Sequence, residues 1–472
     1  MVARKNAKAK PKTKNRKQPP KERVQVPPAA DAIESGSYRA KVRMYRQGLG
    51  DCFLITLPRK SGTPFYILID CGVILGTSDA GTKMKKVVQN ILDTTAGKID
   101  VLVATHEHWD HLSGFLQAKE LFQKLAVGTV WLAWTEDPAD ALARKLKSEY
   151  ESLRLALRVA GTQLRIAGAD TNADVVESML EFFGAFGSGT TTDALQLVKS
   201  LSKSVKFCHP SDPPVELDGV EARVYFLGPP HDEAMIKRFN PSKSHPETYE
   251  MRAAEMFRSN MDQTAEAFDA DAPFDAGSQI PENVARELPH FQNYYWGEDE
   301  DSSEKDQSWR RIDTSWLEQS EELALQLDSA TNNTSLAMAL ELDGESVLLF
   351  AADAQVGNWL SWQDLSWSVD GKTVTGPDLL KRTILYKVGH HGSHNATLKE
   401  KGLELMTALK LALIPVDHAM AVKKRWGNMP LPGIVDRLDK ATSHFVLRID
   451  EDVPREIADR VNATDLYYEV SV

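Results

Sequence analysis

The chain has very little cysteine: Cys52, Cys71 and Cys208 are the only three among its 472 residues, and they stand far apart. This excludes a disulfide framework and a cysteine-based metal motif, and it is typical of a reducing compartment. Long apolar runs are also missing, since no stretch approaches the roughly eighteen residues that a membrane span needs. The first residues lack the apolar segment of a signal peptide. We therefore expect a cytoplasmic protein with no membrane segment.

No repeat of fixed period runs through the chain, so a repeat architecture is not expected. Hydrophobic residues make up 42% of the sequence, which is enough for a large core. A chain of 472 residues is long for one compact domain. The sequence therefore predicts either two domains or one domain with insertions.

Positive charge is concentrated at the N-terminus. Residues 1–23 hold ten Lys or Arg and one Glu, so the rest of the chain carries a net charge of −20 against −11 for the whole. With Pro and Asn between the cations, this composition predicts a disordered basic tail over residues 1–28. Two interpretations remain open: the tail binds the phosphates of nucleic acid, or it is a solubilising arm.

The densest chemical signal follows the apolar segment 101–104, where His106, His108, Asp110 and His111 fall within six positions. A turn after a strand can bring all four side chains to one point, and imidazole and carboxylate ligands suit zinc, manganese or iron. The first two histidines are placed to hold one ion, and Asp110 with His111 a second. The alternative is a solvated loop of unrelated polar residues. Because only 12 histidines occur in the chain, we predict a centre for one or two divalent ions, zinc or manganese.

Other motifs accompany this one in a fixed order. Residues 47–52 read Gln-Gly-Leu-Gly-Asp-Cys, and residues 65–72 run through an apolar stretch into Asp-Cys-Gly. Downstream come Asn-Asn-Thr-Ser at 332–335, an apolar segment that ends in Asp353, and Gly-His-His-Gly-Ser at 389–393. Together these motifs resemble the metallo-β-lactamase superfamily, and in particular the hydrolase domain of the competence channel protein ComEC and its soluble relatives.

The resemblance implies an α/β fold, namely an αββα sandwich over residues 38–472 with insertions at about 137–205 and 231–311. The metal ligands that it implies are His106, His108, Asp110, His111, Asp353 and His390. By the same resemblance, Asp353 is the carboxylate that two ions share. Asp70 orients residues 105–111, which we call the metal loop, through hydrogen bonds. Asp110 also orients the attacking water.

The sequence departs from the family at the first ion. Most relatives carry an imidazole where this chain has residues 332–335, so we expect a weaker ion at His106 and His108. Asn333 and the distant His231 and His209 are candidate replacements, and the alternative for each of the two histidines is an ordinary loop residue.

The motif at 389–393 leaves the roles of two further residues open. We favour His390 as the ligand because it follows the strand first, and His391 is the additional candidate. His394 is a candidate general acid toward a leaving oxygen. Ala352 stands where the relatives have glycine, directly before Asp353.

Periodicity gives the coarse secondary structure. A helix is expected at 113–125, further helices at 141–160, 173–184 and 191–201, and another from Ser315, which has capping-box spacing, to about 327. The acidic segment 231–311 is expected to be partly helical and partly mobile. The strands are predicted at 38–46, 52–57, 65–70, 100–104, 129–134, 222–227, 335–341, 346–351, 383–388, 411–415, 444–448 and 467–471.

Three functions fit these observations, because metal ligands indicate hydrolysis but not the substrate. The first is a phosphodiesterase or nuclease that acts on nucleic acid or a nucleotide, with Lys387 and residues 423–426 as cations and a stacking surface. The second is a hydrolase of small esters, such as phosphocholine esters or lactones. The third is a metal-binding regulatory module, and the insertions are a possible contact for a protein partner. The acidic body argues against polyanions unless the cleft is locally basic.

Deleting residues 1–28 tests the role of the tail. If the tail recruits nucleic acid, the truncated protein should bind long DNA or RNA more weakly, with a flatter dependence on salt, because each lost phosphate contact removes roughly one unit of counterion release. Binding titrations over a range of salt concentrations measure this. An unchanged affinity and salt slope would leave the solubilising arm as the explanation.

Overall fold

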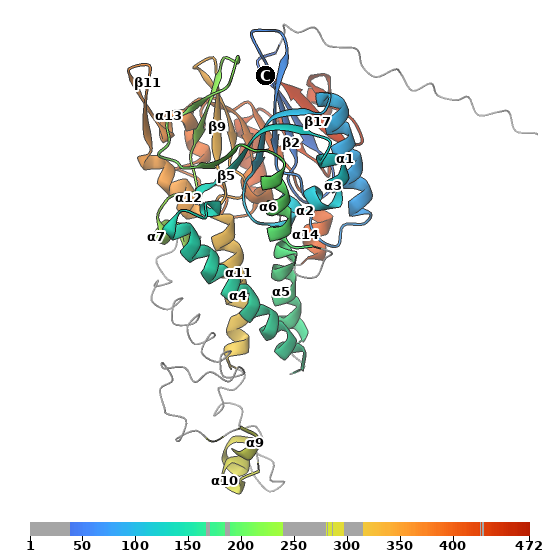
Figure 1. Cartoon of the computed structure of the whole chain (residues 1–472), viewed down its shortest axis with the longest axis vertical. Helices are drawn as coiled ribbons and strands as arrows, with labels where there is room; N and C mark the ends of the chain where they lie inside the picture. The colour runs from blue at the N-terminus through green and yellow to red at the C-terminus, as the bar shows by residue number, and fades with distance from the viewer. Residues whose placement is uncertain are drawn as a thin grey trace, which may run out of the picture. The chain divides into compact units, whose positions relative to one another are not determined.

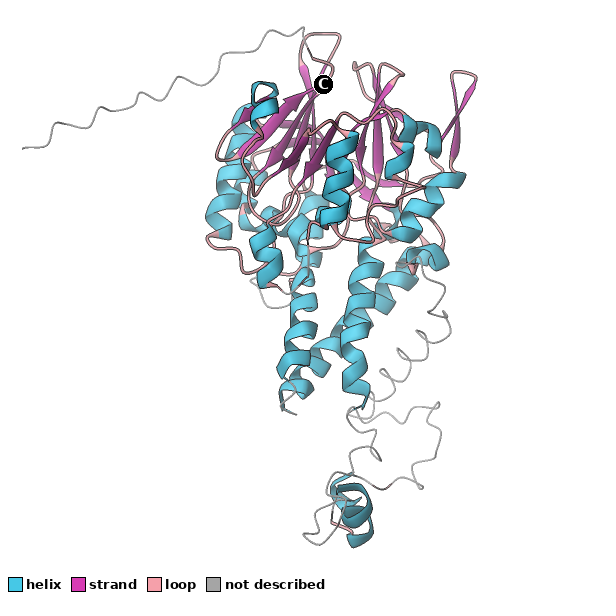
Figure 2. Cartoon of the chain, turned by 180° about the vertical axis from the view of Figure 1, so that it is seen from behind, coloured by secondary structure: helices cyan, strands magenta, loops and turns pink. Residues whose placement is uncertain are grey.

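The computed structural model describes residues 38–166, 170–184, 189–238, 280, 282–285, 287–296, 315–424, 426 and 429–472. The predicted basic tail at 1–28 lies outside these residues, as does most of the predicted acidic insertion at 231–311. The described part is a mixed α/β structure, as the sequence predicted. Two large sheets lie side by side with helices outside them (Figure 2).

The first sheet has eight strands, and their order is β16 (Val461–Ala463), β17 (Tyr467–Ser471), β1 (Lys41–Tyr45), β2 (Phe53–Pro58), β3 (Pro64–Ile69), β4 (Lys98–Ala104), β5 (Ala126–Ala133) and β6 (Val205–Cys208). Neighbours from β16 to β3 pair antiparallel. Neighbours from β3 to β6 pair parallel.

The second sheet has seven strands, in the order β15 (Val446–Arg448), β14 (Leu411–Ile414), β13 (Thr383–Lys387), β10 (Ser346–Phe350), β9 (Met338–Leu342), β8 (Ala222–Phe226) and β7 (Val215–Glu216). Neighbours from β15 to β10 pair parallel and the others antiparallel. A separate hairpin joins β11 (Ser366–Val369) to β12 (Lys372–Thr375).

The helices with known bounds are α1 (Ala80–Thr95), α2 (Trp109–Gln117), α3 (Lys119–Phe122), α4 (Ala141–Ile166), α5 (Asp170–Leu180), α6 (Thr191–Ser200), α7 (Glu233–Ile236), α9 (Glu282–Ala285), α10 (Pro289–Phe291), α11 (Ser315–Asn332), α12 (Val356–Ser361), α13 (Gly376–Lys381), α14 (His418–Lys423) and α15 (Pro432–Ala441). Short turns of other helical types are η1 (Trp134–Glu136), η2 (Glu181–Phe183), η4 (Gln292–Trp296), η6 (Trp362–Asp364), η7 (Gly389–Gly392), η8 (Leu403–Leu405) and η9 (Arg455–Arg460).

Side chains alternate between the two faces of each strand, and this alternation produces the layers of the fold. In β10, Leu348 and Phe350 face the first sheet, whereas Val347 and Leu349 face the helices, because successive side chains of a strand point to opposite faces. The core between the sheets therefore takes one face from each of them. Both outer faces are also apolar, so each must be covered by helices.

Two sets of helices cover these faces. Helices α1, α2, α3 and α6 pack on the first sheet. Helices α12, α13 and α15 pack on the second sheet, and they share one apolar cluster with α4, α5 and α11. The last three helices contact one another and extend together beyond the sheets (Figure 1).

The predicted strands are present, with ends that shift by up to three residues. Five strands, β6, β7, β11, β12 and β16, were not predicted, because they are short and carry little apolar alternation. The helix expected from 113 was placed too late, since α2 begins at Trp109. Within the predicted insertion at 137–205, α6 packs on the first sheet beside α2, whereas α4 and α5 pack with α11.

Among the described residues, no helix combines the length and the apolar character that crossing a membrane requires.

Phe350 tests the core between the sheets. Its ring is 2% exposed and packs edge-on against Phe53, with ring centroids 5.9 Å apart. We expect Phe350→Ala to lower the free energy of unfolding by about 3–5 kcal/mol, because the cavity cannot close between two hydrogen-bonded sheets. Urea denaturation measures this. The matched control is Leu155→Ala, whose side chain is 63% exposed on α4 and which should cost less than about 0.5 kcal/mol. Similar losses for both variants would contradict the assignment.

Candidate metal centre

The predicted donors gather at one edge of the two sheets. Strands β3 and β4 run parallel, as do β10 and β13, so the C-terminal ends of each pair lie at the same edge. Asp70 follows β3, the histidine-rich segment follows β4, Asp353 follows β10, and His390 and His391 follow β13. The donors of both sheets therefore converge.

Four of these side chains form a compact group, which we call the four-residue group: Asp110, His111, Asp353 and His391. One ligand atom from each lies within 4.8 Å of all the others, and all four side chains are buried. His391 Nε2 is 3.0 Å from Asp110 Oδ2, and His111 Nε2 is 3.2 Å from Asp353 Oδ2. The two cross distances are 3.7 Å and 3.9 Å. Ligands of a tetrahedral zinc ion are roughly 3.4 Å apart, so the spacing suits a metal shell.

The two imidazoles of the group are held in the orientation that a ligand needs. His111 Nδ1 lies 2.8 Å from Asp70 Oδ2, and His391 Nδ1 lies 2.8 Å from the carbonyl oxygen of Pro415. When Nδ1–H donates to these acceptors, the lone pair of Nε2 points into the group. Asp70 is itself fixed, because it accepts hydrogen bonds from the backbone N–H and the hydroxyl of Thr105.

A second pair of imidazoles lies beside the group. His106 Nε2 is 3.0 Å from His108 Nδ1. The other nitrogen of His106 lies 3.1 Å from Thr105 Oγ1, which can accept because its own proton goes to Asp70. The other nitrogen of His108 faces Asp328 Oδ1 at 3.6 Å. Each ring thus has an oxygen on one side, and the remaining nitrogens of the two rings lie within hydrogen-bond distance of each other, where a bound ion would take the place of that contact.

His390 lies at the rim of the centre. Its Nε2 is 3.9 Å from Asp353 Oδ2, and its Nδ1 is 3.0 Å from Ser393 Oγ. We expected His390 rather than His391 to ligate with Asp110, but the structure brings His391 into the four-residue group. Both residues have left-handed backbone, with φ of 42° and 52°, so the chain turns sharply and both rings face Asp353.

The electrostatics of the site favour added positive charge. Burial disfavours the ionised form of Asp353, but the charges of His111 and Lys387 outweigh it and hold the pKa of this carboxyl well below its ordinary value. Burial also opposes the charged form of His111, yet Asp353 and Asp110 raise its pKa well above the usual range. A divalent ion would displace such a proton, since metal ligation needs neutral imidazole.

Three other histidines, His106, His108 and His390, have pKa values that are lowered instead of raised. Burial lowers the pKa of His108 to about 3 and that of His390 to about 4. Burial also lowers the pKa of His106 well below its ordinary value. These three rings are therefore neutral at physiological pH, which is the form that binds metals. Burial together with the charges of Asp110 and Asp353 raises the pKa of Asp328.

Close backbone contacts hold the metal loop in place. A Cβ added at Gly50 would lie 2.5 Å from the carbonyl oxygen of Asp110, and one added at Gly72 would lie 2.3 Å from it. The N–H of Asp51 donates to the same oxygen at 3.0 Å. Glycine at these two positions is thus required for the upstream loops to pack directly on Asp110. Ala352 takes the left-handed conformation with φ of 48°.

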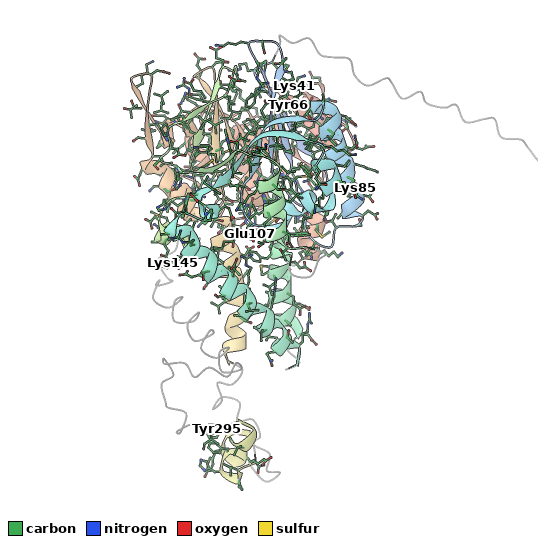
Figure 3. The ribbon with its side chains drawn as sticks, viewed as in Figure 1. Lys41, Tyr66, Lys85, Glu107, Lys145 and Tyr295 are labelled. Carbon is green, nitrogen blue, oxygen red and sulfur yellow. The ribbon has the colours of Figure 1, made fainter. Side chains whose placement is uncertain are left out.

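Glu107 points away from the donors and ties the metal loop to the helices. Its carboxylate accepts hydrogen bonds from the hydroxyls of Thr191 and Thr192, both at 2.9 Å, and pairs with Arg154 at 3.2 Å. Figure 3 shows Glu107 where α4 and α6 meet the sheets. Burial raises the pKa of this carboxyl, but Arg154 and Lys147 outweigh it and lower it. The loop is therefore anchored on both sides.

Aromatic rings cover His108. The ring centroids of Phe182 and Phe183, in η2, each lie 5.1 Å from that of His108. Trp426 stacks on Phe182 at 4.6 Å, and Lys424 pairs with Glu181. The cations and the stacking surface expected at 423–426 are thus partly used within the protein.

Several predicted site residues make other contacts. The amide of Asn333 is used at both ends: its nitrogen donates to the carbonyls of Ile236 and Arg238, and its oxygen accepts from the backbone of Gln355. The structure therefore engages this amide with neighbouring backbone groups, and the prediction that it replaces the missing imidazole stays a prediction.

His231, the other proposed replacement, is half-exposed, pairs with Asp140 at 2.9 Å and packs on Trp134. His394 is exposed and lies outside the buried group. Lys387, predicted to meet substrate, is 1% exposed and binds acidic side chains inside the protein.

Sequence reasoning missed Asp328 and the carbonyl of Pro415. Asp328 lies on α11, about 220 positions from the histidine that it faces, and an acidic residue in a helix gives no signal of burial. A backbone carbonyl carries no side-chain signal at all. The position of Pro415 at the end of the predicted strand 411–415 was the only hint.

The residues present therefore fit one divalent ion at the four-residue group, and His106 and His108 offer two nitrogens for another. The chain matches no protein-family model, and no curated protein is significantly similar to it.

Two isosteric changes test the acceptors behind the rings. Asp70→Asn keeps a carbonyl for Thr105 but removes the acceptor for His111, so the affinity of the four-residue group for zinc or manganese should fall about 10–100-fold. Asp328→Asn should weaken only an ion at His106 and His108. Titration against a chelator of known affinity measures both. If Asp70→Asn binds metal within threefold of wild type, the acceptor does not orient the ligand.

Proposed function

We propose that the protein is a metal-dependent hydrolase with a metallo-β-lactamase type of fold. The observation that carries the proposal is the four-residue group, in which two carboxylate oxygens and two imidazole nitrogens converge within 4.8 Å. The helix–sheet–sheet–helix layers and the order of the motifs support the fold. A site of this composition suits zinc or manganese.

Divalent ions at such a site polarise an ester oxygen and lower the pKa of water. The residues of the chain would hold them as follows. Asp110, His111 and His391 would hold one ion, His106 and His108 would hold the other, and Asp353 would be a ligand to both.

Asp110 has a further role in the proposal. Its Oδ2 faces His391, while its Oδ1 is buried without a hydrogen-bond partner among the described residues. Burial raises the pKa of this carboxyl, but His111 and His391 outweigh it and lower it, so the group is a carboxylate at neutral pH. Oδ1 is therefore the atom available to orient a water and accept its proton.

We propose a phosphodiester as the substrate, as in a phosphodiesterase or nuclease acting on nucleic acid or a nucleotide. The resemblance to the ComEC hydrolase domain supports this choice. A small ester is the second candidate, and one observation favours it: the donor residues are at most 9% exposed. Because the three cysteines are free and buried, we propose a reducing compartment such as the cytoplasm.

Hydrolysis of a small generic phosphodiester tests the proposal. We expect turnover that requires added manganese or zinc and stops with a chelator. Asp110→Ala should lower the rate to below about one hundredth, because it removes both a ligand and the group that orients water. The control is Asp436→Ala, an exposed position on α15, which should retain full activity.

The same assay should include single- and double-stranded DNA and RNA and a small carboxylic ester. Cleavage of esters alone would replace the phosphodiester with the second candidate. Activity of Asp110→Ala above a tenth of wild type would place the reaction elsewhere.

A further inference from the structure

Lys387 is a fully buried cation directly beneath the candidate centre. It is the last residue of β13, and its side chain reaches across from the second sheet to Asp51, which precedes β2 of the first sheet. Its Nζ lies 2.5 Å from Asp51 Oδ2, 2.9 Å from the carbonyl oxygen of Ala352 and 3.4 Å from Asp353 Oδ1. An ammonium has three N–H donors, so these three acceptors use all of them.

Because Asp353 contacts Lys387, its two carboxylate oxygens have different partners. Oδ1 faces Lys387, whereas Oδ2 faces His111 at 3.2 Å, His391 at 3.9 Å and His390 at 3.9 Å. A free carboxylate can turn both oxygens toward a single cation. Here one oxygen is engaged by the lysine, and only the other is presented to the imidazoles.

We propose that Lys387 is a positioning residue that keeps Asp353 in one-oxygen contact with the metal centre, so that Oδ2 can be shared by two ions. This inference rests on the proposed metal-dependent function and deepens it. A simpler role for Lys387 would be to neutralise Asp51, which is 1% exposed. The two roles predict different results when Asp51 is replaced by a neutral residue.

The experiment compares Asp51→Asn with the double variant Asp51→Asn/Lys387→Met. Both lack the buried charge of Asp51. The single variant keeps the ammonium, whose remaining carboxylate partner is Asp353, whereas the double variant has neither charge of the pair. Asp51→Asn retains the contact between Lys387 and Asp353, which the double variant loses. The readouts are manganese stoichiometry and electron paramagnetic resonance, in which two Mn²⁺ ions that share an oxygen give an exchange-coupled signal.

We expect wild type and Asp51→Asn to bind two Mn²⁺ ions and to give the coupled signal. The double variant should lose the coupling and bind the second ion at least tenfold more weakly. If the double variant fails to fold, as judged by circular dichroism, Asp51→Asn/Lys387→Gln replaces it, because the two amides can hydrogen-bond to each other.

The outcomes distinguish a failure of the role of Lys387 from a failure of the metal centre. A double variant that keeps the coupled pair, with affinity within threefold of Asp51→Asn, overturns the role of Lys387 and leaves the metal centre standing. Loss of coupling already in Asp51→Asn assigns the effect to Asp51 and also overturns the inference. A wild-type protein that binds no manganese, or a single uncoupled ion, overturns the shared-oxygen arrangement itself.

Discussion

The burial of several carboxylates in one place is the constraint on which this structure depends. Asp51, Asp70, Asp110 and Asp353 are each at most 1% exposed, and they lie around the same imidazoles. Ionised groups cannot be packed this way unless cations or directed N–H and O–H donors accompany them. Thr105 supplies donors to Asp70, and Lys387 supplies a fixed cation between Asp51 and Asp353. What remains at the four-residue group is two carboxylates facing two imidazoles, and either protons on the imidazoles or a divalent ion can balance the negative charge.

The two-sheet topology makes this concentration possible. Each sheet contributes parallel strands whose C-terminal ends lie at one edge, and a short segment after each strand carries the polar residues. The sheets are held together by an apolar core, so the edges cannot separate without exposing that core. The cost of crowding like charges is thereby offset by packing elsewhere in the molecule. The strained backbone at Asp70, Ala352, His390 and His391 has the same origin, because all four have positive φ at this edge.

Much of the fold could be predicted from the sequence, because the main strands are apolar, alternate in burial and end in clear polar signals. The short edge strands could not, since β7 and β16 have too few residues to show a period. The donors next to strand ends were found for the same reason as the strands. Which of His390 and His391 joins the group depends on their own left-handed backbone. Among residue types, only glycine makes that conformation predictable from the sequence. Asp328 was missed because tertiary packing of α11, rather than local sequence, brings it to His108.

The aromatic cover over His108 has a kinetic consequence. His108 is 0% exposed, and Phe182 and Phe183 pack on its ring while Trp426 holds Phe182 from the other side. Because these rings pack on His108, we expect an ion bound by His106 and His108 to enter or leave only when the rings move. The exchange rate of such an ion would therefore depend on how often the segment with Phe182 and Phe183 opens, and not on diffusion through solvent. A chain that folds around its ions would keep them far longer than equilibrium affinity alone implies.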